Sequence, residues 1–535
     1  MKLGLSNSFN LSVLLCLAAP VAVKAVDGPG FGQVTFDDSE LYKPVATLIM
    51  PKEPQPFGNN LVSMHKGYMM LVFAPDHMLP GGGLRFYDMS DPRHPKVVNT
   101  LNTPQTQEFV EAHGYGASSS YPGDYAVFQS RIGIQFWDLT DVMNPKLIKD
   151  MALPSIDGGG YDNGVFCVFW QAPYVFTASS AHGIHVVDAT DPYNPRLVRH
   201  LLMNQTGNFR AGLIFAVGNL LMTSAVGLDS ISHGYAFFDI SNPENPQQLS
   251  FPKGLPDIYA SLINGNKVYG TGLDSKLYVH DVSNPRDIKL VSTSEVLGPT
   301  HGEYIYIQDH FAMAAEEEMV WKVDLNTMKP VGKPMVLLGD AQEGHPVPFG
   351  NYLVVGDDHT IGTGIIPHIA TPDIVGPSVN MVNPADGSVN QALTSRVGIT
   401  LTDMFDLRSV GKTSFIVREV GGTALPGKYS GQLEILNFSP DHPFKPGTKY
   451  EVVIPKGGIK DVSGNTTPEE FISTFTTKAA SAIIPRAAFV GAAKGMEYWS
   501  AQGRLQPKGS NRAAVGWYAP VSKSSHQESQ GGKNK

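Results

Sequence analysis

Three histidines between residues 111 and 345 each have a glutamate within two residues. They lie in the segments EAHGYG (Glu111 and His113), PTHGEY (His301 and Glu303) and QEGHPV (Glu343 and His345). Imidazole nitrogens are frequent ligands of transition metals, and neighbouring carboxylates orient the rings or complete the coordination shell. If folding brings these segments together, the three imidazoles form a candidate metal site that suits copper or zinc.

A second interpretation of the same region needs no metal. Asp162, Arg210 and Tyr259 also precede apolar segments, and with Glu111, Glu303 and Glu343 they predict a pocket for an anionic or hydroxylated ligand. Arg210 would clamp a carboxylate, and Tyr259 would offer a stacking surface. In a third interpretation these groups are hydrated and hydrogen-bond one another. A hydrolase is less favoured, because the chain has no G-x-S-x-G motif.

A repeated segment indicates which elements position these residues. An apolar strand ends in Asp, and most copies continue with two residues, Asp or Asn, and Pro; the strand-ending residues are Asp88, Asp138, Asp188, Asp239, Asp281 and Asp324. Neighbouring copies are therefore 50, 50, 51, 42 and 43 residues apart. Asp and Asn side chains cap local N–H groups and Pro favours a turn, so each copy predicts a strand followed by a tight turn.

The spacing is close to the roughly 40 to 50 residues that one four-stranded blade of a β-propeller needs. We expect an all-β chain with a seven-bladed propeller over residues 40–370. The first blade is expected to include VATLIM (45–50), and the last to include PMVLL (334–338). The first strand of every blade borders the central channel, so the starts of these strands, where the candidate residues lie, should converge on one funnel.

The D-[hydrophobic]-[ST]-[DN]-P-x-x-P pattern resembles the LVIVD repeat, which forms propellers in exported bacterial and archaeal proteins. The resemblance covers about 330 residues; the second copy has Val142 in place of the first Pro, the fifth has Ile288 in place of the second, and the sixth lacks both. It implies an extracytoplasmic propeller and no shared chemistry. Some propeller enzymes, such as methanethiol oxidase and nitrous oxide reductase, bind copper through histidines in this region, and only that general layout is similar here.

Residues 377–477 resemble the bacterial Ig-like domain found in surface-layer proteins. The resemblance rests on Pro384 with Gly387, the turn and strand at 445–450, the turn formed by Asp461, Gly464 and Asn465, and the closing residues Phe475 and Thr476. Alternating segments such as VGITL and YEVVI suit the strands of a sandwich. The resemblance implies an Ig-like β-sandwich that acts as a spacer or an adhesion module.

The two ends of the chain predict export. Lys2, an apolar stretch from Leu11 to Val23 and small residues before a cut after Ala25 are typical of a signal peptide at 1–25. Residues 481–535 are a polar tail that we expect to be partly disordered. Cys16 leaves with the signal, so Cys167 stands alone and reads as a small buried hydrophobe. No other apolar run approaches the roughly 20 residues of a membrane span.

Charge restricts the partners. The formal net charge is -9 and the isoelectric point is near 6.0, which argues against nucleic acid. Three other acidic groups have simpler explanations: Glu316, Glu317 and Glu318 predict a solvated turn, and Asp357, Asp358 and His359 predict another turn. The pairs of the type Asp88 with Asp91 lack the Glu and Gly of a calcium loop.

These observations leave three functions open, and they do not decide whether the protein is an enzyme. The first is recognition of a protein or small-molecule ligand by a propeller face, with the Ig-like domain as spacer or adhesion module. The second is a metal-dependent, copper-type oxidoreductase with a histidine-lined funnel. The third is a structural component of the cell envelope. In each case the protein is expected in the periplasm, outside the cell or at its surface.

Overall fold

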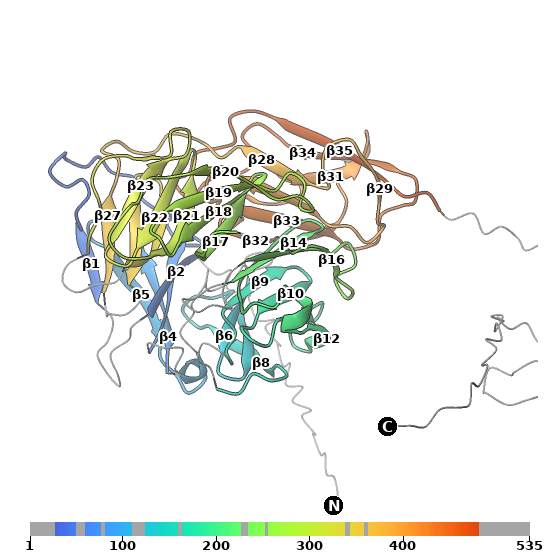
Figure 1. Cartoon of the computed structure of the whole chain (residues 1–535), viewed down its shortest axis with the longest axis horizontal. Helices are drawn as coiled ribbons and strands as arrows, with labels where there is room; N and C mark the ends of the chain where they lie inside the picture. Colours follow the sequence, from blue (N-terminus) through green and yellow to red (C-terminus); the bar gives the residue numbers. More distant parts are fainter. Residues whose placement is uncertain are drawn as a thin grey trace, which may run out of the picture. The chain divides into compact units, whose positions relative to one another are not determined.

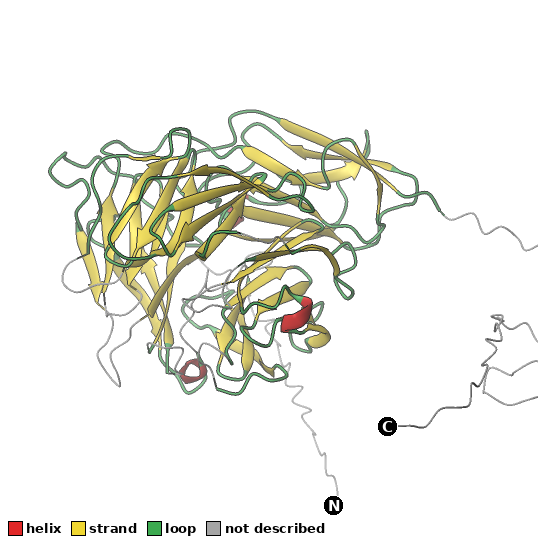
Figure 2. Cartoon of the chain, viewed as in Figure 1, coloured by secondary structure: helices red, strands yellow, loops and turns green. Residues whose placement is uncertain are grey.

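The structure is a computed structural model, and it describes residues 27–49, 59–75, 81–109, 124–158, 163–225, 234–251, 255–337, 343–357 and 362–480. The predicted signal peptide and tail lie outside these residues. Strands dominate the described part (Figure 2). The helices there are short 3-10 turns, η1 (Thr106–Glu108), η2 (Met203–Gln205) and η3 (Leu407–Ser409). None of the described helices has the length and apolarity to cross a membrane.

Seven antiparallel sheets follow one another over residues 46–367 of the described chain (Figure 1). The first four are β2 (Asn59–His65), β3 (Tyr68–Ala74), β4 (Gly83–Asp88) and β5 (Lys96–Leu101); β6 (Tyr125–Ser130), β7 (Gly133–Asp138) and β8 (Lys146–Ala152); β9 (Cys167–Gln171), β10 (Tyr174–Ala178), β11 (Ile184–Asp188) and β12 (Arg196–Leu201); and β13 (Ala211–Val217), β14 (Leu220–Ala225), β15 (Tyr235–Asp239) and β16 (Gln247–Ser250).

The other three sheets are β17 (Ile258–Asn264), β18 (Lys267–Gly272), β19 (Leu277–Asp281) and β20 (Lys289–Thr293); β21 (Gly302–Gln308), β22 (Phe311–Glu316), β23 (Met319–Asp324) and β24 (Lys329–Pro330); and β25 (Glu343–Phe349), β26 (Tyr352–Asp357), β27 (Gly362–Pro367) and β1 (Ala46–Ile49). Within each sheet, consecutive strands pair with their neighbours, as in the blades of a propeller.

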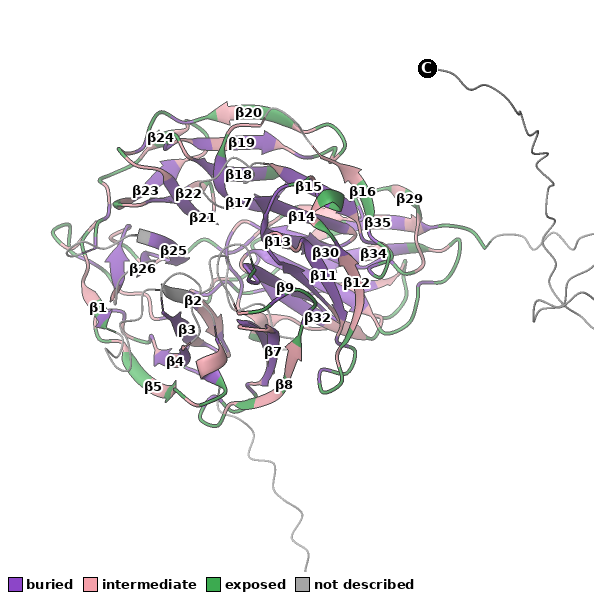
Figure 3. Ribbon diagram, turned by 60° about the horizontal axis from the view of Figure 1, so that its bottom comes forward, coloured by how far each residue is buried: buried purple, intermediate pink, exposed green. Residues whose placement is uncertain are grey.

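The sheets lie around a common centre, with β5, β8 and β20 near the perimeter (Figure 3). First strands of successive sheets contact each other from β6 through β9, β13, β17 and β21 to β25, and β25 and β26 contact β2. The first and second sheets share a buried cluster that includes Phe86 and Trp137. The all-β, propeller prediction is confirmed, and we call this part of the molecule the ring.

The last sheet corrects one sequence prediction. Its outer strand is β1, which pairs with β27 in the register Ala46↔Ile365 to Ile49↔Gly362. The segment VATLIM therefore belongs to the last sheet and not to the first, and Met335 of PMVLL bridges Val320 of the preceding sheet. Both segments are short and apolar and lack the Asp–Pro signature, so local pattern does not show which sheet edge they complete.

The repeated turn is confirmed. In each copy the strand-ending Asp accepts a hydrogen bond at Oδ1 from the backbone N–H two residues later, at 2.7 to 3.0 Å; the donors are Ser90, Thr140, Thr190, Ser241, Ser283 and Asn326. The next Asp or Asn repeats this bond, as Asp141 does with Met143 N–H at 2.9 Å. The carboxylates therefore act as turn caps, which agrees with the preference for a turn over a calcium loop.

The C-terminal sandwich (residues 379–477) consists of two four-stranded sheets. One contains β28 (Val379–Asn383), β30 (Val397–Leu401), β33 (Ile435–Pro440) and β32 (Gly427–Gln432); the other contains β29 (Ser388–Gln391), β35 (Phe471–Thr477), β34 (Lys449–Ile454) and β31 (Ile416–Glu419). Its core packs Val397, Ile399, Phe415, Phe438 and Tyr450 between the sheets. Inward-facing residues of both sheets thus form one core, as in Ig-like sandwiches.

The C-terminal sandwich packs on one face of the ring, where turns join the first and second strands of the sheets. We call this the turn face. Asn437 accepts bonds at Oδ1 from Gln171 Nε2 at 2.9 Å and Gly218 N at 2.8 Å, and donates from Nδ2 to Ala216 O at 2.9 Å. The next turns follow: Gly265 N–H bonds Thr400 Oγ1 at 2.9 Å, and Asp309 N–H bonds Thr402 O at 2.6 Å.

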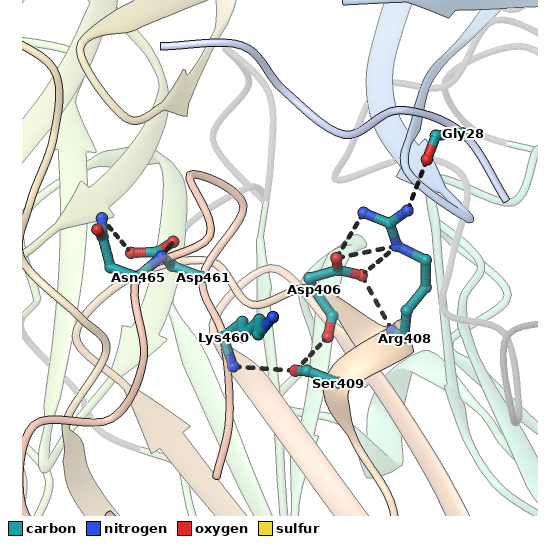
Figure 4. A network of polar contacts seen from close by, with 7 residues as sticks. All are labelled: Gly28, Asp406, Arg408, Ser409, Lys460, Asp461 and Asn465. Carbon is teal, nitrogen blue, oxygen red and sulfur yellow. Dashed lines mark hydrogen bonds and ion pairs between the residues drawn. The ribbon is translucent and has the colours of Figure 1, made fainter. Parts of the chain in front are cut away.

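Close backbone approach and charge complete this contact. A Cβ on Gly398 of β30 would lie 2.0 Å from the backbone nitrogen of Gly218, so only glycine permits the approach. At the edge of the sandwich, the Arg408 guanidinium bonds Asp406 and donates to Gly28 O at 2.8 Å, which connects the N-terminal segment to η3 (Figure 4). The sandwich is therefore fixed to the ring through buried polar contacts.

Candidate functional site

The structure places the predicted residues at the starts of first strands. Arg210 directly precedes β13, Tyr259 lies in β17, His301 precedes β21, and Glu303 and His345 lie in β21 and β25. We call this side of the ring the funnel face. Each of β17, β21 and β25 is seven residues long, about 20 Å, so the funnel face lies opposite the turn face.

Part of the predicted set cannot be placed. Glu111, His113 and Asp162 lie outside the described residues, as do Asp358 and His359 of the predicted turn. Glu343 begins β25, and its side chain is likewise outside the described part. The three-histidine metal site therefore stays a prediction.

Two carboxylates flank His301. Its Nε2 lies 2.9 Å from Glu303 Oε1, and its Nδ1 lies 3.5 Å from Glu317 Oε2. The hydrogen bond to Glu303 raises the pKa of His301; burial opposes this, and the negative charges of Glu303, Glu317 and Glu316 add to the rise. An imidazolium that faces a carboxylate at both nitrogens is a double hydrogen-bond donor without a lone pair for a metal.

Aromatic rings extend this site across three strands. The Tyr259 ring lies 5.2 Å from the His301 ring and 6.2 Å from Tyr304, which stacks on His345 at 4.0 Å. His345 Nδ1 is 3.3 Å from the hydroxyl of Tyr306. Folding thus brings Tyr259, His301 and Glu303 together, and His345 joins them through Tyr304. Tyr304 and His345 are fully buried and Tyr259 is 5% exposed, so the rings pack as an apolar layer beside the charged groups.

The acidic run at 316–318 is not a solvated turn throughout, and that prediction is wrong for Glu316. Its side chain is 1% exposed, and burial raises its pKa to about 7; the positive charge of His301 lowers it, and the negative charge of Glu318 raises it. A Cβ on Gly298 would lie 1.8 Å from Glu316 Oε2, so this loop closes tightly over the carboxyl group. Glu318, at the end of the run, is exposed as expected.

Sequence reasoning missed Glu316 and Glu317 as site residues, although a signal was present. The β21–β22 hairpin turns at residues 308–311, and its register places Gly302 opposite Glu316. The backbone N–H of Glu317 donates to His301 O at 3.3 Å. Counting back from the turn along both strands would have brought the acidic run next to the Thr-His-Gly-Glu segment.

Several carboxyl oxygens at this site lack protein partners. Among the described residues, Glu303 Oε2 and both carboxyl oxygens of Glu316 are buried and accept no hydrogen bond. Glu303 is 4% exposed as a whole residue. Buried acceptors of this kind are costly unless water or a ligand donates to them. The site can therefore accept hydrogen bonds from a ligand more readily than it can bind a further anion.

The C-terminal sandwich closes the other end of this region. The tip of its β32–β33 hairpin carries Glu434, which is fully buried and lies close enough to Tyr306 to raise the pKa of that hydroxyl in addition to burial. Burial raises the pKa of Glu434 to about 8, although the backbone N–H of Ile307 lowers it. Ile435 and Met404 of the sandwich belong to the same hydrophobic cluster as the ring strands. The turn face is thus sealed below Tyr306.

A groove of about 470 Å³ lies between the ring and the sandwich, away from these groups. Its lining consists mostly of amides, prolines and small residues, with Asp239 and Lys478 as the charged groups. We therefore place the candidate site at the funnel face, where titratable groups and aromatic rings occur together.

Comparison with known proteins identifies one part of the chain. The family model described as bacterial Ig-like domain matches residues 373–477, which are the C-terminal sandwich and the segment before it. No curated protein matches the chain.

Among the solved structures that resemble the chain are two propeller domains and a designed protein. The β-propeller domain of Myceliophteria thermophila Cps50 (Swd1) has 13% identity and a TM-score of 0.44, and the match covers 60% of this chain and 99% of that one. The WD40 β-propeller domain of Doa1 has 12% identity and a TM-score of 0.40, with coverages of 60% and 95%. The computationally designed Ika8 protein has 11% identity and a TM-score of 0.41, with coverages of 61% and 100%.

Proposed function

We propose that this protein is a ligand-binding β-propeller that recognises its ligand at the funnel face, around His301, Glu303, Glu316 and Tyr259. The observation that carries the proposal is the asymmetry of the ring. The C-terminal sandwich covers the turn face, whereas at the opposite face Glu303 Oε2 and both carboxyl oxygens of Glu316 are buried and accept no hydrogen bond among the described residues.

The charge of the site favours one class of ligand. His301 lies beside the carboxyl groups of Glu303, Glu316 and Glu317, so three carboxyl groups face one imidazole and the cluster has an excess of hydrogen-bond acceptors. We propose a small ligand that donates hydrogen bonds through a protonated amine or hydroxyl groups, with an apolar part against Tyr259. The anionic ligand considered from sequence is less favoured by these acids.

We also infer that the seven sheets are seven blades of one closed ring, and that the repeat belongs with the LVIVD type. The repeated Asp turn at 88, 138, 188, 239, 281 and 324 supports both inferences. With them come the proposed boundaries: a signal peptide at 1–25, the propeller at 40–370, the Ig-like domain at 377–477 and a tail at 481–535. Export to the periplasm or cell surface remains part of the same proposal.

Binding can be tested with two related probes. Glucosamine carries an ammonium group and hydroxyls, whereas N-acetylglucosamine has no charged amine. We expect calorimetry to show glucosamine binding to the wild-type protein, with at least about tenfold loss in Glu303→Gln, because a charged acceptor contributes more than a neutral one. Glu318→Gln is the matched control, since Glu318 is an exposed neighbour of the same cluster.

The result also separates the alternatives. Equal binding of both sugars would assign recognition to hydroxyl groups alone. Absence of heat with glucosamine and with spermidine, a probe for polyamines, would contradict the proposed ligand class. For the copper or zinc alternative, metal analysis of untagged protein beside a His113→Ala, His301→Ala double variant gives the answer: bound metal that disappears in the variant would replace our proposal.

A further inference from the structure

A second group of acidic side chains lies where the ring meets the C-terminal sandwich. Asp373 precedes the sandwich, Asp403 follows β30, and Asp461 lies in the loop before β35. One carboxylate oxygen from each of the three lies within 4.8 Å of the other two. Asp403 and Asp461 are each 1% exposed. Three carboxylates thus converge in a region that water hardly reaches.

No cationic side chain among the described residues forms an ion pair with this group. The partners are neutral: Asn465 Nδ2 donates to Asp461 Oδ2 at 3.1 Å and to Asp373 Oδ2 at 3.3 Å, and Met404 N donates to Asp403 Oδ1 at 2.7 Å. Figure 4 shows Asn465 turned toward Asp461. Buried charges of one sign need a compensating charge, because desolvation and mutual repulsion both oppose ionisation.

Desolvation and mutual repulsion raise the pKa values of the buried carboxyl groups Asp403 and Asp461. Burial raises the pKa of Asp403 far above its ordinary value, and the charges of Asp461, Asp309 and Asp373 raise it further. Burial raises the pKa of Asp461 to about 7, with a further contribution from Asp373. Asp309, on the adjoining turn of the ring, has its pKa raised to about 6 by burial first and by Asp373 second, while His310 and Lys322 lower it.

An independent feature of the ring points into the same place. Gln308, the last residue of β21, is 3% exposed, and its Nε2 donates to Gly350 O at 3.0 Å and lies 3.3 Å from Asp403 Oδ2. Its Oε1 is buried and accepts no hydrogen bond among the described residues. The Gln308 amide therefore contacts Asp403 from a different part of the chain, and its buried carbonyl oxygen is left without a hydrogen-bond donor in the described structure.

We propose that Asp373, Asp403, Asp461 and the amide oxygen of Gln308 bind one calcium ion, which fastens the C-terminal sandwich to the ring. All four donors are oxygens, which hard cations prefer, and no imidazole or thiolate belongs to the group. Calcium tolerates an irregular arrangement of carboxylates and amide carbonyls better than magnesium, which demands near-octahedral geometry.

The ion would act as a cross-link between parts that are far apart in sequence. Gln308 belongs to the ring, Asp373 to the connecting segment, and Asp403 and Asp461 to the sandwich. Calcium binds only when these parts are docked, so it should stabilise the docked form by mass action. The site lies at the turn face and is independent of the proposed ligand site at the funnel face.

The test is thermal unfolding of the full chain in EDTA and in 1 mM calcium chloride, together with calorimetric titration of the metal. The wild-type protein should unfold about 5 °C higher with calcium and bind one ion. Asp403→Asn keeps the shape and the acceptor for Met404 N–H but cannot become a carboxylate that binds a cation. This variant should be at least as stable as wild type in EDTA and should lose the calcium shift.

Controls make the outcome decisive. Asp441→Asn changes an exposed carboxylate of the same sandwich, paired with Lys428 at 3.5 Å, and should keep the full shift. Gln308→Leu should weaken binding from the ring side, and it replaces Asp403→Asn if that variant does not fold. A wild-type protein without a calcium shift, or a shift that persists in Asp403→Asn or Gln308→Leu, overturns the proposal. An equal shift with magnesium chloride would contradict the choice of calcium.

Discussion

The two ends of the ring hold titratable residues in opposite states for different physical reasons. At the funnel face, His301 is stabilised as an imidazolium because carboxylates face both of its nitrogens. At the turn face, Glu434 is stabilised as a neutral acid because the docked sandwich removes it from water. Neighbouring charge decides the first case and desolvation the second. The chain thus has a group of ionisable residues around His301 that suits ligand binding, and a buried neutral acid, Glu434, that suits packing against the sandwich.

The neutral state of Glu434 predicts how stability depends on pH. Its pKa is raised from 4.5 to about 8 on folding, so between these values the folded protein keeps a proton that the unfolded chain has lost. Wild-type stability should therefore fall with rising pH relative to Glu434→Gln, by at most about 1.4 kcal/mol per pH unit. Urea unfolding of both proteins at pH 5, 6.5 and 8 measures this difference.

Glu318→Gln serves as the control, because an exposed carboxyl group should leave the pH profile unchanged. If Glu434→Gln and wild type keep a constant difference in unfolding free energy from pH 5 to pH 8, Glu434 is ionised in the folded protein. Burial by the sandwich would then not keep this carboxyl group neutral.

At the scale of elements, the same turn occurs six times and ends the next-to-last strand of six of the seven sheets in the same way. Asp138 Oδ1 and Asp141 Oδ1, for example, accept from Thr140 and Met143 at 2.9 Å each. The sheet that joins the two ends of the ring departs from this repeat, because its described residues lack the Asp turn. There, β1 supplies an outer strand to the sheet of β25, β26 and β27, so residues from both ends of the ring share one ladder.

This shared ladder predicts the effect of losing β1. A chain that begins at residue 51 leaves the edge of β27 without its partner and removes Leu48, which is 8% exposed, from the core. We expect it to unfold several degrees lower than a chain that begins at residue 27 and to aggregate more readily, because an open strand edge pairs with other chains. Light scattering and thermal unfolding report both effects. Equal melting temperatures would show that β1 does not close the ring.

At the scale of the whole molecule, the ring and the C-terminal sandwich form one compact unit. Arg396 of the sandwich is 4% exposed and donates to Gln171 Oε1 and to Ile240 O of the ring, and burial lowers the pKa of its guanidinium to about 10. Such contacts fix the orientation of the sandwich on the ring, whereas a flexible spacer domain would be free to reorient. They also leave the funnel face as the broad surface of the ring that the sandwich does not cover.

Removal of Asn437 should weaken this docking. In Asn437→Ala the buried groups Gln171 Nε2, Gly218 N–H and Ala216 O each lose a partner. We expect a loss of at least about 2 kcal/mol in unfolding free energy, because unsatisfied buried groups cost about 1 to 3 kcal/mol each. The control is Gln248→Ala, an exposed amide on β16. A loss below that of the control in urea unfolding would mean that the two parts are not held by this network.

Local chemistry explains how much could be predicted without coordinates. The propeller class, the repeated turns, the buried Cys167 and the presence of a C-terminal Ig-like domain follow from residues that are close together in sequence. Strand alternation and Asp–Pro turns act over a few residues, so they are visible in the sequence itself. The spacing of the repeats also places Tyr259, His301 and Glu303 at the starts of first strands. These strands approach one axis in a propeller, so the three residues are expected to lie near one another.

What only the tertiary structure decided depends on contacts between residues that are far apart in the chain. The membership of β1 in the last sheet, the docking of Asn437 on Gly218, and the burial of Glu316, Glu434 and Asp461 have no local signature. An acidic residue in a sequence reads as solvated because water is its usual partner. The residues that fold around an acidic side chain decide whether it becomes part of a ligand site, a buried neutral acid or a metal ligand, because desolvation and neighbouring charge arise only in three dimensions.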